Sequence, residues 1–237
     1  MREISRNARN VQGQPMFRVI DKVRQLEAQG RRIIHMEIGD PDFGTPPNII
    51  EAAKASLDHG ETHYVSSWGL PEFIDTIRQT TQRSRGFLPD TNQVLVTPGA
   101  NIAIFYAIFC LANPGQEVLV PDPGFPTYLS AIRSCGAVPV AYPLHDSNGF
   151  RMRAEDIEAR ITDKTRLLII NSPQNPTGAI TEPEALREIF ELAVKHDIYV
   201  YSDETYARMV HEDQDFFSPA ALDACRERVI LSNGFSK

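Results

Sequence analysis

The chain has 237 residues and a mass of 26.6 kDa, with 42% hydrophobic residues, 23% charged residues and a formal net charge of −7. These values are typical of a folded globular protein and exclude a disordered or fibrous chain. The acidic balance, 31 Asp and Glu against 24 Lys and Arg without a basic run, excludes the charge pattern typical of nucleic-acid-binding proteins.

Membrane and secretory signals are not expected either. The longest apolar run, 102–112, is shorter than the roughly 20 residues that cross a membrane, and no apolar stretch follows the charged residues after Met1. The three cysteines, Cys110, Cys135 and Cys225, are odd in number and widely spaced, which is typical of reduced thiols. We therefore expect a cytoplasmic protein without disulfides.

The first 45 residues differ in pattern from the rest. They contain one amphipathic helical pattern at about 15–29, then the short segment 33–38, and a turn-rich stretch that begins at Gly39. We expect residues 1–45 to form an N-terminal arm and the start of a small domain, and residues 46–237 to form the large domain.

From residue 47 onward, helical patterns alternate with short β-rich runs. We predict helices at 47–58, 70–85, 100–112, 124–135, 153–160, 182–196 and 217–224, and strands at 93–97, 117–120, 138–142, 166–170, 198–202 and 228–232. Thr181 and Glu184 have the spacing of a capping box, and Ser218-Pro219 is a second helix-start signal. Most of the strands are continuous apolar runs, as in sheets covered on both faces. The pattern predicts an α/β fold, a three-layer sandwich with a mostly parallel sheet.

Ligands of open α/β sheets bind beyond the carboxyl ends of the strands, so the segments that follow the strands are the candidate site. Pro98-Gly-Ala-Asn101 is a glycine turn that enters a helix, which suits a phosphate but also an ordinary connecting turn. Phe125 follows the next strand and suits either a flat ligand or the core. Asn171 to Gly178 is dense in turn-forming residues that place an amide at a strand end.

Two further strand ends carry ionisable residues. Asp203 suits a binding carboxylate or a helix N-cap, and Tyr206 follows three positions later. Lys237 suits an amine that forms a Schiff base or a solvated surface lysine. An apolar strand followed by Asp-Glu also resembles the metal motif of nucleotide-hydrolysing proteins, but the chain lacks their G-x-x-x-x-G-K-[ST] loop. It also lacks G-x-G-x-x-G, G-x-S-x-G and H-E-x-x-H, which excludes a dinucleotide-binding protein, a hydrolase with a nucleophile elbow and a zincin. We expect no metal site.

Taken together, these segments resemble the fold type I, pyridoxal-phosphate-dependent aminotransferases of class I/II, the aspartate aminotransferase superfamily. The resemblance spans nearly the whole chain in the family's order. The motifs that carry it are Gly39-Asp-Pro-Asp-Phe43, Thr62-His-Tyr64, Gly69-Leu-Pro-Glu72, Thr97-Pro-Gly-Ala-Asn101, Asn171-Ser-Pro-Gln-Asn-Pro-Thr-Gly178, Ser202-Asp-Glu-Thr-Tyr206 and Ser232-Asn-Gly-Phe-Ser-Lys237.

The resemblance implies a role for each catalytic and ring-binding residue. Lys237 is similar to the lysine that holds the cofactor aldehyde and moves the substrate proton. Asp203 is similar to the carboxylate that pairs with the pyridine nitrogen and keeps it protonated, which makes the ring an electron acceptor. Asn175 and Tyr206 are similar to the residues that hydrogen-bond the ring oxygen.

The remaining positions concern the phosphate, the ring face and the substrate. The resemblance implies that Gly99, Ala100 and Asn101 bind the phosphate at the helix N-terminus and that Phe125 stacks on the ring. Tyr64 is similar to the tyrosine that reaches the phosphate of the neighbouring subunit, which implies a homodimer with shared sites. The residues implied for substrate binding are Ile38, Gly39 and Asn175.

Three positions depart from the family pattern. Gly234 stands where many relatives have a serine that binds the phosphate, and Phe125 stands where dicarboxylate-specific enzymes often have tryptophan. Asn101 stands where some aspartate-specific relatives have a lysine, so we expect no strict preference for aspartate. Met16 and Phe17 add apolar surface to the arm.

The resemblance implies a cytoplasmic, homodimeric enzyme of amino-acid metabolism and biosynthesis that transfers an amino group from an L-amino acid to a 2-oxo acid by a ping-pong mechanism. Two alternatives stay open: a lyase or synthase of the same fold, such as a β-eliminating enzyme, and a non-catalytic sensor domain. Family members continue beyond the lysine that corresponds to Lys237 with two binding arginines and most of the small domain. The sequence is therefore either a shortened piece of a longer protein or a non-functional fragment, and we expect the first.

Overall fold

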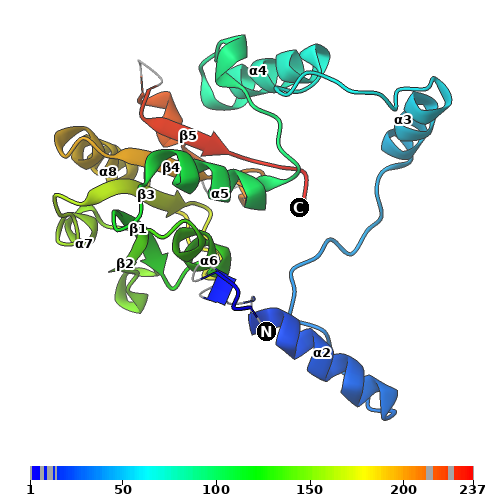
Figure 1. The fold of residues 1–237 in the computed structure, drawn as a ribbon, viewed down its shortest axis with the longest axis horizontal. Coiled ribbons are helices and arrows are strands. Elements are labelled where there is room, and N and C mark those ends of the chain that lie inside the picture. The colour runs from blue at the N-terminus through cyan, green and yellow to red at the C-terminus, as the bar shows by residue number, and fades with distance from the viewer. Residues whose placement is uncertain are drawn as a thin grey trace.

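The computed structural model describes residues 2–5, 8, 9, 13, 15–211, 216–223 and 227–236. Its centre is a sheet of five parallel strands in the order β2-β1-β3-β4-β5 (Figure 1). The strands are β1 (Glu117–Asp122), β2 (Val138–Pro143), β3 (Thr165–Asn171), β4 (Tyr199–Asp203) and β5 (Val229–Ser232). The predicted α/β fold with a parallel sheet is confirmed.

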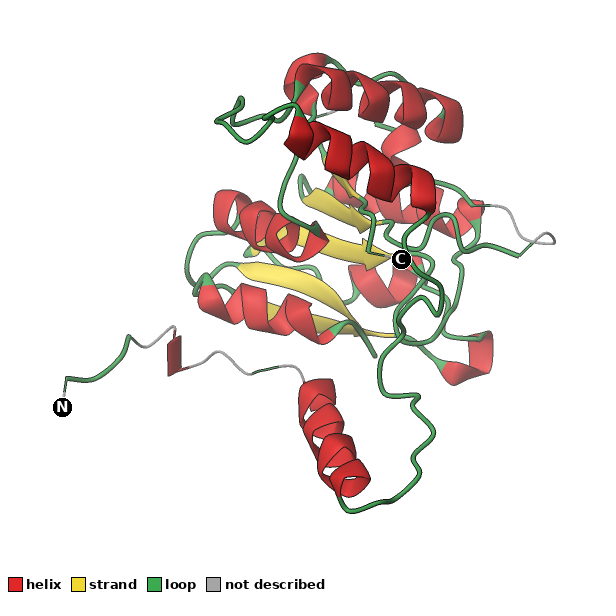
Figure 2. Cartoon of the chain, turned by 90° about the vertical axis from the view of Figure 1, so that its right-hand side faces the viewer, coloured by secondary structure: helices red, strands yellow, loops and turns green. Residues whose placement is uncertain are grey.

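Helices cover both faces of this sheet (Figures 1 and 2). On one face, α5 (Ala100–Leu111) and α6 (Pro126–Ser134) pack on alternate strand residues such as Val118 and Ile169. On the other face, α7 (Ala154–Glu158) and α8 (Pro183–Lys195) pack on the intervening residues, such as Leu119 and Ile170. Because both sets of side chains are buried, the central strands are continuous apolar runs, as the sequence predicts.

The amino-terminal part contains α2 (Pro15–Ala28), α3 (Pro47–Asp58) and α4 (Pro71–Arg85). Figure 1 shows α2 and α3 lying away from the sheet on extended connections, and α3 has no buried residue. Proline begins α3, α4, α6 and α8, where its missing N–H costs no helical hydrogen bond. The division of the chain at residue 45 stays a prediction.

Two predicted elements are wrong. Residues 94–97 form no strand: the segment follows a short 3₁₀ turn at Thr91–Gln93, and the Val96 N–H donates to the Trp68 carbonyl at 3.0 Å instead of a sheet partner. The helix expected at 217–224 is, within the described residues, a single 3₁₀ turn at Pro219–Ala221.

The expected capping box at α8 is also wrong. Glu182 is the N-cap, and its side chain caps no N–H. Thr181 Oγ1 instead accepts the N–H of Met152 at 3.3 Å, while the N–H of Thr181 donates to Ser172 Oγ at 3.1 Å. A tertiary contact has therefore taken the hydroxyl that the sequence pattern assigns to the helix.

Among the described helices, none is long and apolar enough to cross a membrane. The 12-residue α5, which contains the longest apolar run, has Ile104 and Ile108 almost completely buried against the sheet. One face of the run is therefore part of the core, while Tyr106 and Phe109 on the other side are exposed.

The core on the α8 face makes a testable prediction. Ile189 is 1% exposed and packs among β-strand side chains, so Ile189→Ala should lower the free energy of unfolding by about 2 to 5 kcal/mol. The control is Val194→Ala on the same helix, where the side chain is 51% exposed and the change should be within about 0.5 kcal/mol. Urea unfolding of the full-length protein measures both; equal losses would contradict the assigned core.

Candidate active site

Three neighbouring strands end in polar residues at the same edge of the sheet. Asn171 at the end of β3 is paired in register with Asp203 at the end of β4, and Asp203 with Ser232 at the end of β5. All three residues are buried. The parallel register therefore places the segments that follow these strands, including the predicted binding residues, side by side.

The carboxylate of Asp203 is buried and held by neutral donors. Its Oδ2 accepts the hydroxyl of Tyr128 at 2.7 Å, and its Oδ1 accepts the Thr205 hydroxyl at 2.8 Å and the Thr205 N–H at 3.2 Å. Among the described residues Asp203 forms no ion pair, although it is only 6% exposed. Since a buried charge needs compensation, a carboxylate in this state suits a cationic ligand.

Tyr128 contacts the Asp203 carboxylate, and the sequence analysis did not single it out. It lies on α6 three positions after Phe125, and its side chain is 1% exposed. Burial and the nearby Asp203 carboxylate raise the pKa of Tyr128 well above its usual range. The phenol therefore stays protonated and acts as a donor to Asp203.

Asn175 and Tyr206 lie together, as expected. The Asn175 Nδ2 donates to the Tyr206 hydroxyl at 3.3 Å, and both residues are half-buried. The pKa of Tyr206 is raised, because the effect of burial is larger than the opposing effect of the hydrogen bond from Asn175. The two side chains thus present an amide and a phenol toward one another from separate loops.

Asn171 joins this pair to Asp203. Its Oδ1 accepts the N–H of Asn175 at 2.8 Å, and its Nδ2 donates to the Asp203 carbonyl at 3.0 Å. The dense turn sequence after β3 therefore has a structural purpose, because one buried amide fixes the loop that carries Asn175 to the end of β4.

The predicted phosphate turn lies at the N-terminus of α5. Gly99 is the N-cap with φ +92°, a conformation that favours glycine, and no side chain caps the helix. The first N–H groups of an α-helix have no partner within the helix, so Ala100 and Asn101 begin a helix end that suits an anion. A Cβ built on Gly234 would lie 3.9 Å from the Ala100 Cβ, so the segment before Lys237 passes beside this turn.

Phe125 contacts Tyr128, the residue that donates to the Asp203 carboxylate. It is the half-buried N-cap of α6, and its ring meets the Tyr128 ring edge to face at 5.6 Å between centroids. Tyr128 in turn donates to Asp203. Phe125, the residue expected to stack on a flat ligand, is therefore linked to the buried carboxylate through Tyr128.

Three predicted positions lie apart from this cluster. Ile38 and Gly39 are exposed in the connection between α2 and α3, and Tyr64 is fully exposed between α3 and α4 (Figure 1). The structure therefore does not bring them to Asp203. Lys237 lies outside the described residues.

Comparisons with known proteins identify the family of the chain. The profile of the family "Aminotransferase class I and II" matches residues 31–237. The aspartate aminotransferase of Pyrococcus abyssi is 40% identical over 219 residues, 92% of this chain and 56% of that protein. The aromatic-amino-acid aminotransferase 2 of Thermococcus litoralis is 40% identical over 89% of this chain and 54% of that protein.

The solved structures give the same result. The aspartate aminotransferase of Thermus thermophilus with maleate superposes with a TM-score of 0.95 at 33% identity, and the match covers 100% of this chain and 61% of that chain. The chain thus spans little more than half the length of the curated relatives it matches. The family expected from the sequence is confirmed, together with the pyridoxal phosphate cofactor of that family: the chain belongs to the class I and II aminotransferases.

Proposed function

We propose that the protein to which this chain belongs is a pyridoxal-phosphate-dependent aminotransferase that moves an amino group from an L-amino acid to a 2-oxo acid. The observation that carries the proposal is the Asp203 carboxylate, which is buried at a strand end and has no cationic partner among the described residues. Membership of the aminotransferase family supports the reaction class.

The residues present fit this cofactor. The carboxylate of Asp203 suits a protonated pyridine nitrogen, the donors Asn175 and Tyr206 suit the ring oxygen, and the aromatic ring of Phe125 suits the ring face. The α5 N-terminus at Gly99, Ala100 and Asn101 suits the phosphate. When bound, pyridoxal phosphate supplies an electron-accepting ring that stabilises negative charge at the substrate α-carbon.

The chain's own residues have separable tasks in this proposal. Asp203 holds the proton on the pyridine nitrogen, and Tyr128 and Thr205 orient its two carboxylate oxygens. Lys237 binds the cofactor aldehyde through its amine and moves the proton at the substrate α-carbon. Asn175 contacts the substrate from the loop after β3, and Ile38 and Gly39, which lie exposed and apart from Asp203 in this chain, would contact it from the amino-terminal segment.

A homodimer with shared sites is part of the same proposal. Tyr64 is fully exposed and therefore free to reach a neighbouring subunit, and Val65 and Trp68 beside it are also exposed, at 60% and 47%.

A cytoplasmic location is also part of the proposal. The free thiols of Cys110 and Cys135 support it, because thiols stay reduced in the cytoplasm.

The amino-acid donor is the least defined part of the proposal. Related enzymes carry names that refer to aspartate, aromatic amino acids and arginine. Asn101 is neutral at the position where a lysine would pair with a distal carboxylate, so we propose a donor range that is not restricted to aspartate. Neither β-elimination nor a sensor role is favoured by any observation on this chain.

Lys237 provides the first test. With pyridoxal phosphate added to the full-length protein, a visible absorption band should appear, and borohydride reduction should fix the cofactor on Lys237, as peptide mass spectrometry would show. One amino acid should then yield one pyridoxamine phosphate. Label on another residue would refute the role of Lys237, and release of pyruvate and ammonia would establish the eliminating alternative.

Asp203 provides the second test. Asp203→Ala should leave the cofactor bound through its phosphate and aldehyde contacts but slow proton removal from the substrate by orders of magnitude, because an unprotonated ring accepts electrons poorly. Stopped-flow absorbance with a deuterated amino acid measures this step. Near-normal turnover in the variant would exclude the proposed role.

Tyr128 provides a third test with a matched control. Tyr128→Phe removes the hydroxyl that orients Asp203 Oδ2, so the carboxylate is less well placed for the pyridine nitrogen and cofactor affinity should fall about tenfold. Tyr142→Phe also removes a buried hydroxyl, one that donates to the Ile169 carbonyl at 2.9 Å in the other core, and should lower stability only. Equal cofactor affinity in both variants would show that Tyr128 has no part in the site.

A further inference from the structure

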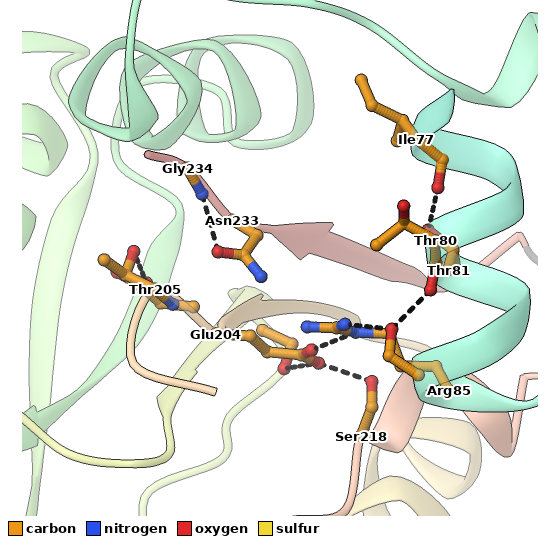
Figure 3. Close-up of polar contacts among 12 residues, drawn as sticks. Ile77, Thr80, Thr81, Arg85, Glu204, Thr205, Ser218, Asn233 and Gly234 are labelled. Carbon is orange, nitrogen blue, oxygen red and sulfur yellow. Dashed lines mark hydrogen bonds and ion pairs between the residues drawn. The ribbon is translucent and has the colours of Figure 1, made fainter. Parts of the chain in front are cut away.

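A buried ion pair joins α4 to the end of β4 (Figure 3). Arg85, the last residue of α4, donates from Nε to Glu204 Oε2 at 2.9 Å, and the two side chains are only 5% and 1% exposed. The partners are 119 positions apart in the chain. Glu204 directly follows Asp203, so this contact lies one residue from the proposed cofactor carboxylate.

Glu204 is fixed at its side chain and its backbone. The hydroxyls of Ser202 and Ser218 both donate to its Oε1, and its N–H donates to the Ser232 carbonyl at 2.9 Å. Successive side chains of a strand point to opposite faces, so Asp203 faces Tyr128 while Glu204 faces α4. The contacts that fix Glu204 therefore also fix the adjoining backbone of Asp203, from the opposite face of the sheet.

The same helix also contacts the segment that leads to Lys237. Phe73 near the start of α4 stacks on Phe235 with 6.0 Å between the ring centroids. Phe235 lies two residues before Lys237. One helix thus touches the chain beside both of the proposed key residues, Asp203 and Lys237.

Stability alone is a poor reason for this ion pair. Removing two charges from water costs several kcal/mol per ion, and well-packed apolar residues of similar volume are often as stable or more stable. Burial raises the pKa of Glu204 against the opposing effects of Arg85 and the two serines. The Nη2 of Arg85 is also buried without a hydrogen-bond partner among the described residues. What the pair adds is a fixed direction and distance between α4 and β4.

We propose that Arg85 is a positioning residue which, through Glu204, holds the Asp203 carboxylate in place for the cofactor. This inference rests on the proposed function, because it assigns Asp203 to the cofactor. It concerns residues that contact neither cofactor nor substrate directly. Loss of the ion pair should therefore displace the Asp203 carboxylate, while every residue proposed to contact the cofactor is still present.

The experiment compares variants of the full-length protein. Arg85→Gln removes the pair, Arg85→Lys keeps its charge, and the double variant Arg85→Met with Glu204→Leu replaces it by apolar side chains. The control is Arg78→Gln on the same helix, which removes an ion pair to Asp75 at 3.0 Å and a hydrogen bond to the Pro89 carbonyl.

Hydrogen exchange of the cofactor-free protein is the first readout. In Arg85→Gln and in the double variant, the N–H groups of Glu204 and Thr205 should exchange faster, beyond any change in global stability, because they bond to Ser232 and Asp203. Arg78→Gln should leave them unchanged and Arg85→Lys should restore part of the protection. This arm does not need the cofactor, so it separates the positioning of Asp203 from the proposed function.

Cofactor binding is the second readout. The dissociation constant should rise about tenfold or more in Arg85→Gln and in the double variant, and the pH midpoint of the visible band should shift, because small misplacements of a site are costly. If Arg85→Gln fails to fold, the double variant decides. A double variant as stable as the wild type, with wild-type affinity and exchange, would overturn the proposal. A wild-type protein that binds no cofactor would refute the proposed function instead.

Discussion

The structure depends on the burial of one carboxylate at the end of a parallel strand. Asp203 is 6% exposed and receives hydrogen bonds from Tyr128 and Thr205, yet no described cation accompanies it. Burying a charge without an opposite charge is unfavourable. The surrounding fold must therefore offset this cost until a cationic ligand group does so.

The two cores, one on each face of the sheet, stabilise the strand that carries Asp203. β4 lies between β3 and β5, with Tyr201 in one core and Val200 in the other. Because β4 is packed on both faces, its carboxyl end cannot shift relative to the ends of the neighbouring strands. Two polar contacts at this edge then orient the side chain of Asp203: Tyr128 from α6 bonds to it on one face, and Arg85 from α4 bonds to the adjacent Glu204 on the other.

Much of this arrangement could be predicted from the sequence. The apolar run at 167–170 indicates a strand covered on both faces, and the structure confirms it as part of β3. The prolines at positions 47, 71, 126 and 183 stand at helix starts. Asn175 with Tyr206 was also predictable, because each lies in a motif at the end of its own strand.

The parts that could not be predicted depend on contacts between distant segments. Nothing local distinguishes Tyr128 from any other aromatic residue on a helix, and its role follows only from the 2.7 Å contact with Asp203. Thr181 has the pattern of a helix cap, but Met152 takes its hydroxyl. Arg85 resembles an ordinary basic residue at a helix end until the fold brings Glu204 to it.

The central claim is that Asp203 holds a proton on the pyridine nitrogen of the cofactor. Nuclear magnetic resonance of the full-length protein loaded with ¹⁵N-labelled pyridoxal phosphate measures that proton directly, through the chemical shift of the ring nitrogen. The account predicts a protonated nitrogen in the wild-type protein and an unprotonated one in Asp203→Ala at the same pH. An unprotonated nitrogen in the wild type, or a shift that Asp203→Ala leaves unchanged, would contradict it.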